Sequence, residues 1–326
     1  MMHIVTVNDS QTGQSYQYDA DMVINNADSG IAFYISQLAV LDPKIYDVKY
    51  RNIIFPEVVP VDTSMPEWID NVNYISYDAV TMGKFIAANG KDLPQSDIDA
   101  NISSVPVGYA GNSYGYTLEE LRKSQQMRLP LDVTKARVAY RGAQEHMQRV
   151  AWFGDASRGM TGMFNNLNIP LDNSTVNWAT ATGQEMVNDM NSLLIKVWST
   201  SANVHVPDTL LLPSDKYAIA SSKRMDTGTD TTVMEFFKRN NLFRDITGQE
   251  IEVRPILELQ TANTAGTGPR MMAYEKTPDN LVMYNPIPWR PLAPQPNGLR
   301  IEVSAEYKIS GVEFRYPGSA AYRDML

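Results

Sequence analysis

Two short acidic motifs have the most obvious catalytic potential in this sequence. Residues 28–30 read Asp-Ser-Gly and residues 226–228 read Asp-Thr-Gly, and two such aspartates can share a proton as the acid and base of an aspartic protease. In that class of enzyme each triplet follows an apolar strand that buries the carboxyl pair. The preceding residues here are Asn-Asn-Ala and Lys-Arg-Met, so the motifs do not predict a protease, and the first one is better explained as a helix start.

The histidines and glycine-rich segments predict neither a metal site nor a nucleotide site. His3, His146 and His205 are the only histidines, and none has the spacing of a motif such as His-Glu-x-x-His. The glycines of residues 108–111 lack the pattern of a phosphate-binding loop, and the polar run 226–232 lacks the spacing of an EF-hand. We therefore predict no catalytic residue, no cofactor-binding residue and no metal ligand.

The composition is that of a globular protein with a sizeable core. The chain has 326 residues, of which 43% are hydrophobic, and a formal net charge of -9, which disfavours tight binding to nucleic acid phosphates. It contains no cysteine, which excludes disulfides and thiolate chemistry and suits a reducing cytoplasm. Neither an export signal nor an apolar stretch of about 20 residues is present, so we expect a soluble protein without a membrane partner.

The first third of the chain is predicted to be extended. Residues 3–7 and 15–18 have the pattern of paired strands in a polar arm, and Ser29 can cap a short helix after them. Strands over 73–80 and 102–107, separated by polar turn residues, predict a long protruding hairpin. Neither face of its first strand is cleanly polar, so both faces need cover. An internal strand pair of an ordinary α+β domain is the alternative.

A long helix is predicted after this hairpin. Thr117 and Glu120 form a capping box, Pro130 interrupts the helix that begins there, and a longer helix runs from Asp132 to Gly154. Its apolar positions share one face: Ala136, Ala139, Tyr140, Ala143, Met147, Val150 and Ala151. Its polar positions share the other: Arg137, Arg141, Gln144, Gln148 and Arg149.

The second half of the chain predicts a module of mixed helices and strands. A capping box at Thr182 and Glu185 opens an amphipathic helix, whose apolar side carries Met186, Met190, Leu193, Leu194 and Val197. The other predicted elements are strands over 209–213, 250–257, 270–276 and 280–289 and a helix over 233–240. Alternating segments over 299–316 should pair with earlier parts of the fold, so this module is inserted between two pieces of another.

Five landmarks, taken in order, resemble one protein family. They are Leu-Asp-Pro-Lys-Ile-Tyr-Asp-Val at 41–48, Gly-Lys-Asp-Leu-Pro at 90–94, Tyr-Gly-Tyr-Thr-Leu-Glu-Glu-Leu at 114–121, Trp-Phe-Gly-Asp at 152–155 followed by Gly-Met-Phe-Asn at 162–165, and Ile-Ser-Gly-Val at 309–312. Together they resemble the major capsid proteins of tailed bacteriophages with the Hong Kong 97 fold, especially a subgroup long catalogued as a domain of unknown function.

The resemblance implies an α+β fold with four parts. Residues 1–57 would form an N-terminal arm and 58–112 an extended loop, or E-loop. Residues 113–170 and 299–326 would form a peripheral domain with a long spine helix, and 175–298 an axial α/β domain. Some relatives join a loop lysine to a neighbour's asparagine; Lys84 and Lys91 are suggestively placed, but we assign no residues to such a cross-link.

The function implied is that of a structural subunit and not of an enzyme. Such subunits assemble as hexamers and pentamers into an icosahedral head around double-stranded DNA, which an acidic shell would contact weakly and non-specifically. The implied location is the virion, after assembly in the host bacterial cytoplasm. Portal and decoration proteins are possible partners. The chain differs from some relatives in lacking a long helical scaffolding segment at its N-terminus, so scaffolding either comes from a separate protein, which Met1 favours, or was removed before residue 1.

Three other functions are weighed against a phage head. An encapsulin-like shell around protein cargo has the same fold, and a tail or baseplate subunit is a different structural class. An acidic-residue hydrolase is the most distant alternative, because it would need converging polar groups with displaced pKa values, which no spacing in this sequence predicts.

Overall fold

The computed structural model describes residues 4–8, 15–19, 52–80, 97–120, 122, 131–226 and 228–325. The chain divides into two units, Met1–Asn52 and Ile53–Leu326. In the first unit, β1 (Ile4–Asn8) pairs antiparallel with β2 (Ser15–Asp19), which confirms the predicted strand pair of the arm. The helix predicted after Ser29, residues 41–48 and the hairpin turn with Lys84 and Lys91 lie outside the described residues.

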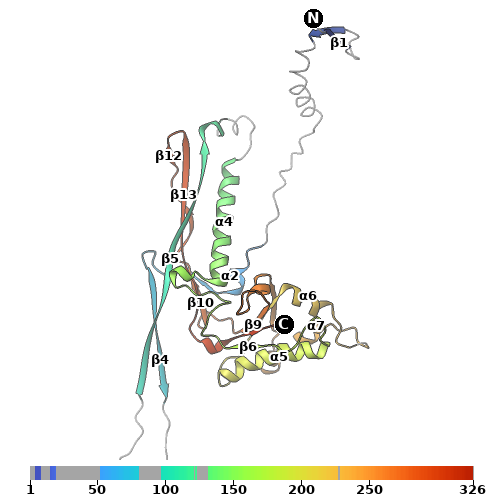
Figure 1. The fold of residues 1–326 in the computed structure, drawn as a ribbon. Coiled ribbons are helices and arrows are strands. Elements are labelled where there is room, and N and C mark those ends of the chain that lie inside the picture. Colours follow the sequence, from blue (N-terminus) through green and yellow to red (C-terminus); the bar gives the residue numbers. More distant parts are fainter. Residues whose placement is uncertain are drawn as a thin grey trace, which may run out of the picture. The chain divides into compact units, whose positions relative to one another are not determined.

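A long antiparallel hairpin leads into a larger sheet. Strand β4 (Asn71–Val80) pairs with the first half of β5 (Asp97–Thr117), from Asn71 opposite Pro106 to Val80 opposite Asp97. The second half of β5 pairs with β13 (Arg300–Ser310), and β13 also pairs with β11 (Ile287–Pro291) and β12 (Gln295–Asn297) (Figure 1). The predicted hairpin is confirmed.

Strand β5 is much longer than the 102–107 segment that the sequence predicts. It has 21 residues, because its second half, although it contains three glycines, is held along its whole length by β13. Its ladder partner changes from β4 at Pro106 to β13 at Val107. Proline has no N–H to donate, so it fits this point, where β5 has a neighbour on one side only.

The long helix α4 (Leu131–Phe153) lies beside β5 and β13 (Figure 1) and confirms the helix predicted over 132–154. Ala143, Met147, Val150 and Ala151 are buried as expected. The assignment of Gln148 to the polar face is wrong, because its side chain is only 3% exposed. The segment before the short helix α2 (Phe55–Val58) crosses α4 here, and the Ile54 N–H donates to Gln148 Oε1 at 2.9 Å.

A second, mixed sheet has the strand order β6 (Leu171–Asn173), β15 (Ala320–Asp324), β9 (Arg270–Tyr274), β7 (Thr209–Pro213) and β8 (Glu252–Ile256). It packs with four helices, α5 (Gly183–Thr200), α6 (Ser214–Ser222), α7 (Val233–Arg239) and α8 (Leu242–Thr247). The strands predicted at 209–213, 250–257 and 270–276 and the helix predicted at 233–240 are confirmed. The predicted capping box of α5 is present, with both Thr182 and Glu185 hydrogen bonds formed.

A small third sheet joins distant parts of the second unit. Its order is β14 (Val312–Phe314), β10 (Leu281–Tyr284) and β3 (Val61–Asp62). The strand predicted over 280–289 is therefore two strands, β10 here and β11 in the hairpin sheet. The last strand of the chain, β15, lies in the other sheet, between β9 and β6. The C-terminal strands thus pair both with strands that precede the inserted segment, β5 and β6, and with strands inside it, β11 and β9.

Candidate functional site

The residues first considered for catalysis are not gathered into one site. Residues 28–30 lie outside the described part of the chain, and Asp226 is exposed in the loop between α6 and α7. His205 Nδ1 lies 2.6 Å from Glu275 Oε2, which also accepts a hydrogen bond from Asn280 Nδ2 at 2.9 Å. Within the described ranges, no three histidine or carboxylate side chains group as metal ligands would, and no helix has the length and apolar content needed to cross a bilayer.

The first surface is the β4–β5 hairpin, whose base is firmly attached. Val72 and Val105 pack with Val282 and Tyr284, and the Tyr74 hydroxyl donates to Glu313 Oε1 at 2.6 Å. Burial and this hydrogen bond raise the pKa of Tyr74 to about 12. One face of the hairpin base is therefore covered from within the chain.

On the opposite face of the hairpin, the described pair Ile75 and Ile102 is exposed. Ile75 and Ile102 are directly opposed across the two strands, and their side chains are 54% and 67% exposed. Among the residues that the structure describes, the expected cover of β4 is present on one face only. Two opposed isoleucine side chains that remain exposed to water are apolar surface, and burying them against another molecule would be favourable.

The second surface is the loop of residues 63–70 that precedes β4. Arg290 binds Glu67 through two nitrogen–oxygen contacts of 2.9 and 2.8 Å and also donates to Glu306 at 2.7 Å. Lys308, which is buried, donates to Asp70 Oδ1 at 3.0 Å. These side-chain bonds and a longer one of 3.4 Å from Lys308 Nζ to the Glu67 carbonyl hold the loop, yet Trp68 is 81% exposed.

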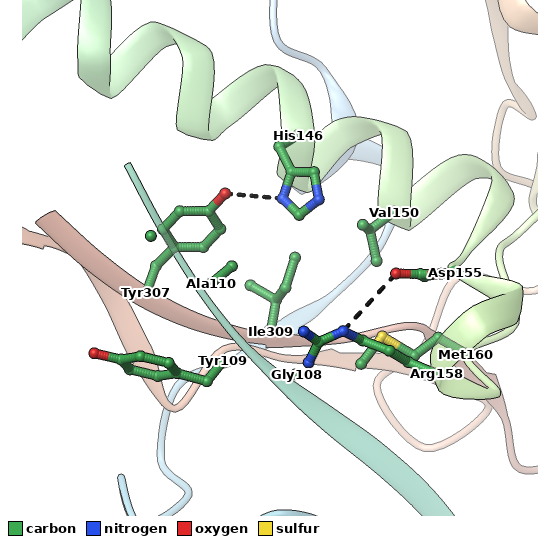
Figure 2. Close-up of a pocket in the computed structure, with 11 residues that line it drawn as sticks. Gly108, Tyr109, Ala110, His146, Val150, Asp155, Arg158, Met160, Tyr307 and Ile309 are labelled. Atoms are coloured by element: carbon green, nitrogen blue, oxygen red, sulfur yellow. Dashed lines mark hydrogen bonds and ion pairs between the residues drawn. The ribbon is translucent and has the colours of Figure 1, made fainter. Parts of the chain in front are cut away.

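The third surface is a cavity of about 320 Å³ between α4 and the hairpin sheet. Figure 2 shows the imidazole of His146 beside the ring of Tyr307, whose hydroxyl lies 2.8 Å from His146 Nδ1. The cavity is also lined by the buried residues Val150, Met160 and Ile309, by Asp155 and Arg158 on its rim, and by Tyr109 and Ala110 of β5. Gly108 also lines the cavity. A Cβ at this position would lie 2.7 Å from Met160 Cε.

Protonation of His146 makes subunit stability depend on pH. Burial lowers the pKa of His146, and the nearby Arg149 and Arg158 act in the same direction against Asp155. The unfolded chain keeps a histidine pKa near about 6.5, so on acidification the unfolded state takes up this proton first, and stability falls as the pH drops through that value.

We expect the wild-type subunit to lose more stability than His146→Gln when the pH is lowered from about 7.5 to about 5.5 across the ordinary histidine pKa. Urea denaturation midpoints of the two proteins at each pH measure the difference, because other titrating groups contribute equally to both. A wild type that gains stability relative to the variant in acid would show that the fold prefers the imidazolium form.

The sequence did not single out Trp68, Arg290 or Tyr307. A tryptophan two residues after Pro66, in a polar segment between strands, is a composition that favours an exposed turn, and this was the one local indication of Trp68. Glu67, which Arg290 binds, is 223 residues away along the chain, and His146, which Tyr307 contacts, is 161 residues away, so no local pattern reveals these two contacts.

Comparisons with known proteins agree with one another. A family model described as major capsid protein matches residues 82–326, while no curated protein sequence matches. The capsid of Myoviridae phage XM1 aligns with a TM-score of 0.76 at 13% identity, covering 89% of this chain and 98% of that one. A chain from Mycobacterium phage Ogopogo aligns with a TM-score of 0.59 at 10% identity, covering 88% and 96%. The capsid of a native GTA particle aligns with a TM-score of 0.60 at 10% identity, covering 88% and 95%.

Proposed function

Because this chain belongs to the major capsid protein family, with the Hong Kong 97 type of α+β fold that its landmarks indicate, we propose that it assembles as hexamers and pentamers into the icosahedral head of a phage. The family match over residues 82–326 carries this proposal. The role is structural: the free energy of assembly comes from surface that subunits bury on one another, and closed symmetry adds many such contacts.

Four parts of the subunit divide this work in the proposal. Residues 1–57 are the N-terminal arm, 58–112 the extended loop, and 113–170 with the returning strand β13 the peripheral domain, in which α4 is the spine helix. Residues 175–298 are the axial domain. We assign the last strand, β15, to the axial domain, because it pairs with β9 and β6; the sequence had assigned all of 299–326 to the peripheral domain.

The proposed partners follow from the surfaces and the charge. The open face of the β4–β5 hairpin binds neighbouring copies, since Ile75 and Ile102 have no cover within the subunit's described residues. A net charge of -9 supports weak, non-specific contact with packaged double-stranded DNA. Separate scaffolding, portal and decoration proteins complete the particle, which forms in the host cytoplasm.

Electron microscopy and sedimentation of the purified full chain, alone and co-expressed with a scaffolding protein, test the proposal. We expect capsomer rings or closed shells at low and moderate salt. Shells that contain DNA support a phage head, whereas shells that contain only protein cargo indicate an encapsulin-like compartment. A chain that stays monomeric even with scaffold contradicts assembly.

The double substitution Ile75→Asp/Ile102→Asp is expected to abolish assembly without unfolding the subunit. In the free subunit, substitutions at exposed positions change the folding stability by about 0.5 kcal/mol or less. In the assembled interface, the two carboxylates would be buried opposite each other and would lose their hydration. Shell yield by sedimentation and the urea midpoint of the free subunit measure the two effects. The matched variant Ile75→Val/Ile102→Val keeps the apolar face and should assemble; equal shell yields from both variants would contradict a role for this face.

A further inference from the structure

We infer that Trp68 of one subunit inserts into the cavity between α4 and the hairpin sheet of the next subunit. This inference rests on the proposed assembly of copies and names one contact within it. The occupant of the cavity is therefore the indole ring of a second copy of this chain, and the cavity is the one lined by His146, Tyr307, Val150, Met160 and Arg158.

The two parts of this contact lie on opposite faces of the same sheet. Successive side chains of a strand point to opposite faces, and in β13 the ring of Tyr307 reaches His146 of α4. Its neighbours Glu306 and Lys308 instead reach Arg290 and the 63–70 loop. Trp68 is thus on the face away from α4, while the cavity is on the face toward it, so a subunit cannot fill its own cavity.

The indole is presented by a backbone that is already ordered. Glu67 is bound twice by Arg290, and Lys308 contacts both the Glu67 carbonyl and Asp70. Met65 and Ile69 pack on the apolar cluster of the hairpin base. Little loop entropy remains to be lost on binding, which is the condition under which an exposed tryptophan contributes most to an interface.

The cavity matches an indole in size and chemistry. Its volume of about 320 Å³ is at the lower end of the range for sites that bind one small ligand, roughly 300–1,000 Å³. Two aromatic walls, His146 and Tyr307, stand edge to face with ring centroids 5.8 Å apart, and Met160 supplies a thioether, which is favourable beside an aromatic ring.

The rim of the cavity adds charged groups that suit the same ring. The side chain of Arg158 is 54% exposed, so its guanidinium can cover the face of an inserted indole in a cation–π contact. The Asp155 carboxylate, 3.9 Å from Arg158, is an acceptor for the indole N–H. Hydrogen bonds from the Ser157 hydroxyl and N–H hold the pKa of Asp155 below its usual value, so this acceptor is ionised at neutral pH.

Because Trp68 lies on one face of the sheet and the cavity on the other, the contact between two copies is head-to-tail. Such heterologous contacts do not close as a dimer; they continue from copy to copy and produce rings when the rotation closes. The contact thus fits the ring-shaped hexamers and pentamers of the proposed function, with each subunit giving one Trp68 and accepting another.

Directed cross-linking tests this contact. The chain contains no cysteine, so only the introduced thiols can react. The full-length double variant Trp68→Cys/Arg158→Cys, assembled and treated with a short bismaleimide, should give a ladder of covalent oligomers on a denaturing gel. An equimolar co-assembly of the two single variants should stop at dimers, and each single variant alone should give none. Cross-linked dimers from Trp68→Cys alone would overturn the inference, since they require a symmetric contact.

Substitution of Trp68 supplies a second readout. We expect Trp68→Ala to raise the concentration at which rings or shells form by about tenfold or more, as for an interface hot spot, with Trp68→Phe intermediate. Leu167→Ala, which removes another exposed apolar side chain (98% exposed), is the control. If shells form at the wild-type concentration from Trp68→Ala and no cross-link appears, the inference fails and the proposed function stands. If the wild type forms no rings even with scaffold, the proposed function itself fails.

Discussion

Replacing Gly154 by alanine should lower the free energy of unfolding of the subunit by about 3 kcal/mol or more, the sum of left-handed backbone strain and overpacking. Gly154 ends α4 with φ of 66°, and an added Cβ would lie 2.1 Å from the Met160 carbonyl oxygen and 2.8 Å from the Gly162 nitrogen. The crowding atoms are backbone, which cannot rotate away as a side chain can.

The turn around Gly154 has no freedom to relieve this clash. The Asp155 N–H donates to the Met160 carbonyl at 3.1 Å, and the Met160 N–H returns a bond to Asp155 at 2.9 Å. Gly159→Ala is a matched control: its φ is 67°, but nothing lies within 4 Å of a Cβ there, so about 1–2 kcal/mol is expected from the backbone conformation alone. Urea denaturation of both variants measures the difference, and equal losses would show that the turn is free to open.

The second large effect is expected at Arg323, a buried cation in strand β15. Its guanidinium donates to Asp189 Oδ1 at 2.9 Å and to Asp172 Oδ2 at 2.8 Å, and Asp189 is itself 6% exposed. The substitution Arg323→Met leaves the carboxylate of Asp189 buried without its cation. We expect a loss of about 3–5 kcal/mol in the free energy of unfolding.

An exposed ion pair provides the comparison for Arg323. Arg239 and Glu235 are four residues apart on α7, with their nitrogen and oxygen atoms 2.6 Å apart and side chains 64% and 48% exposed. Arg239→Met should cost about 0.5 kcal/mol or less. Both variants are compared by urea denaturation, and a loss at Arg323 no larger than that at Arg239 would mean that water reaches Asp189 when the arginine is removed.

The sequence predicted well the elements whose cause is local. The Thr182 capping box forms because its two partners are three residues apart, and α4 follows from helical spacing of apolar residues between Pro130 and Gly154. The hairpin strands follow from short apolar and β-branched runs around polar turns. The family resemblance had the same character, since each landmark is a short contiguous segment.

What the sequence missed depends on contacts between distant segments. Gln148 lies on the polar side of a helical wheel, yet it is buried. The segment that contains Ile54, 94 residues earlier, crosses the helix there, and the Ile54 N–H donates to the Gln148 side chain. The place of β15 depends on pairing with β9 and β6, which strand pattern alone does not specify. The cavity and the anchoring of Trp68 likewise arise only when β13 brings Tyr307 and Lys308 to opposite faces of one sheet.

The length of β5 has a mechanical consequence. One continuous strand runs from the hairpin into the sheet beside α4, and 11 residue pairs join its second half to β13. A pull on the hairpin along the strand therefore loads this ladder in shear, so that many hydrogen bonds share the force at once instead of opening one after another. In the proposed assembly, tension applied to the hairpin by a neighbouring subunit would pass along β5 directly into its ladder with β13.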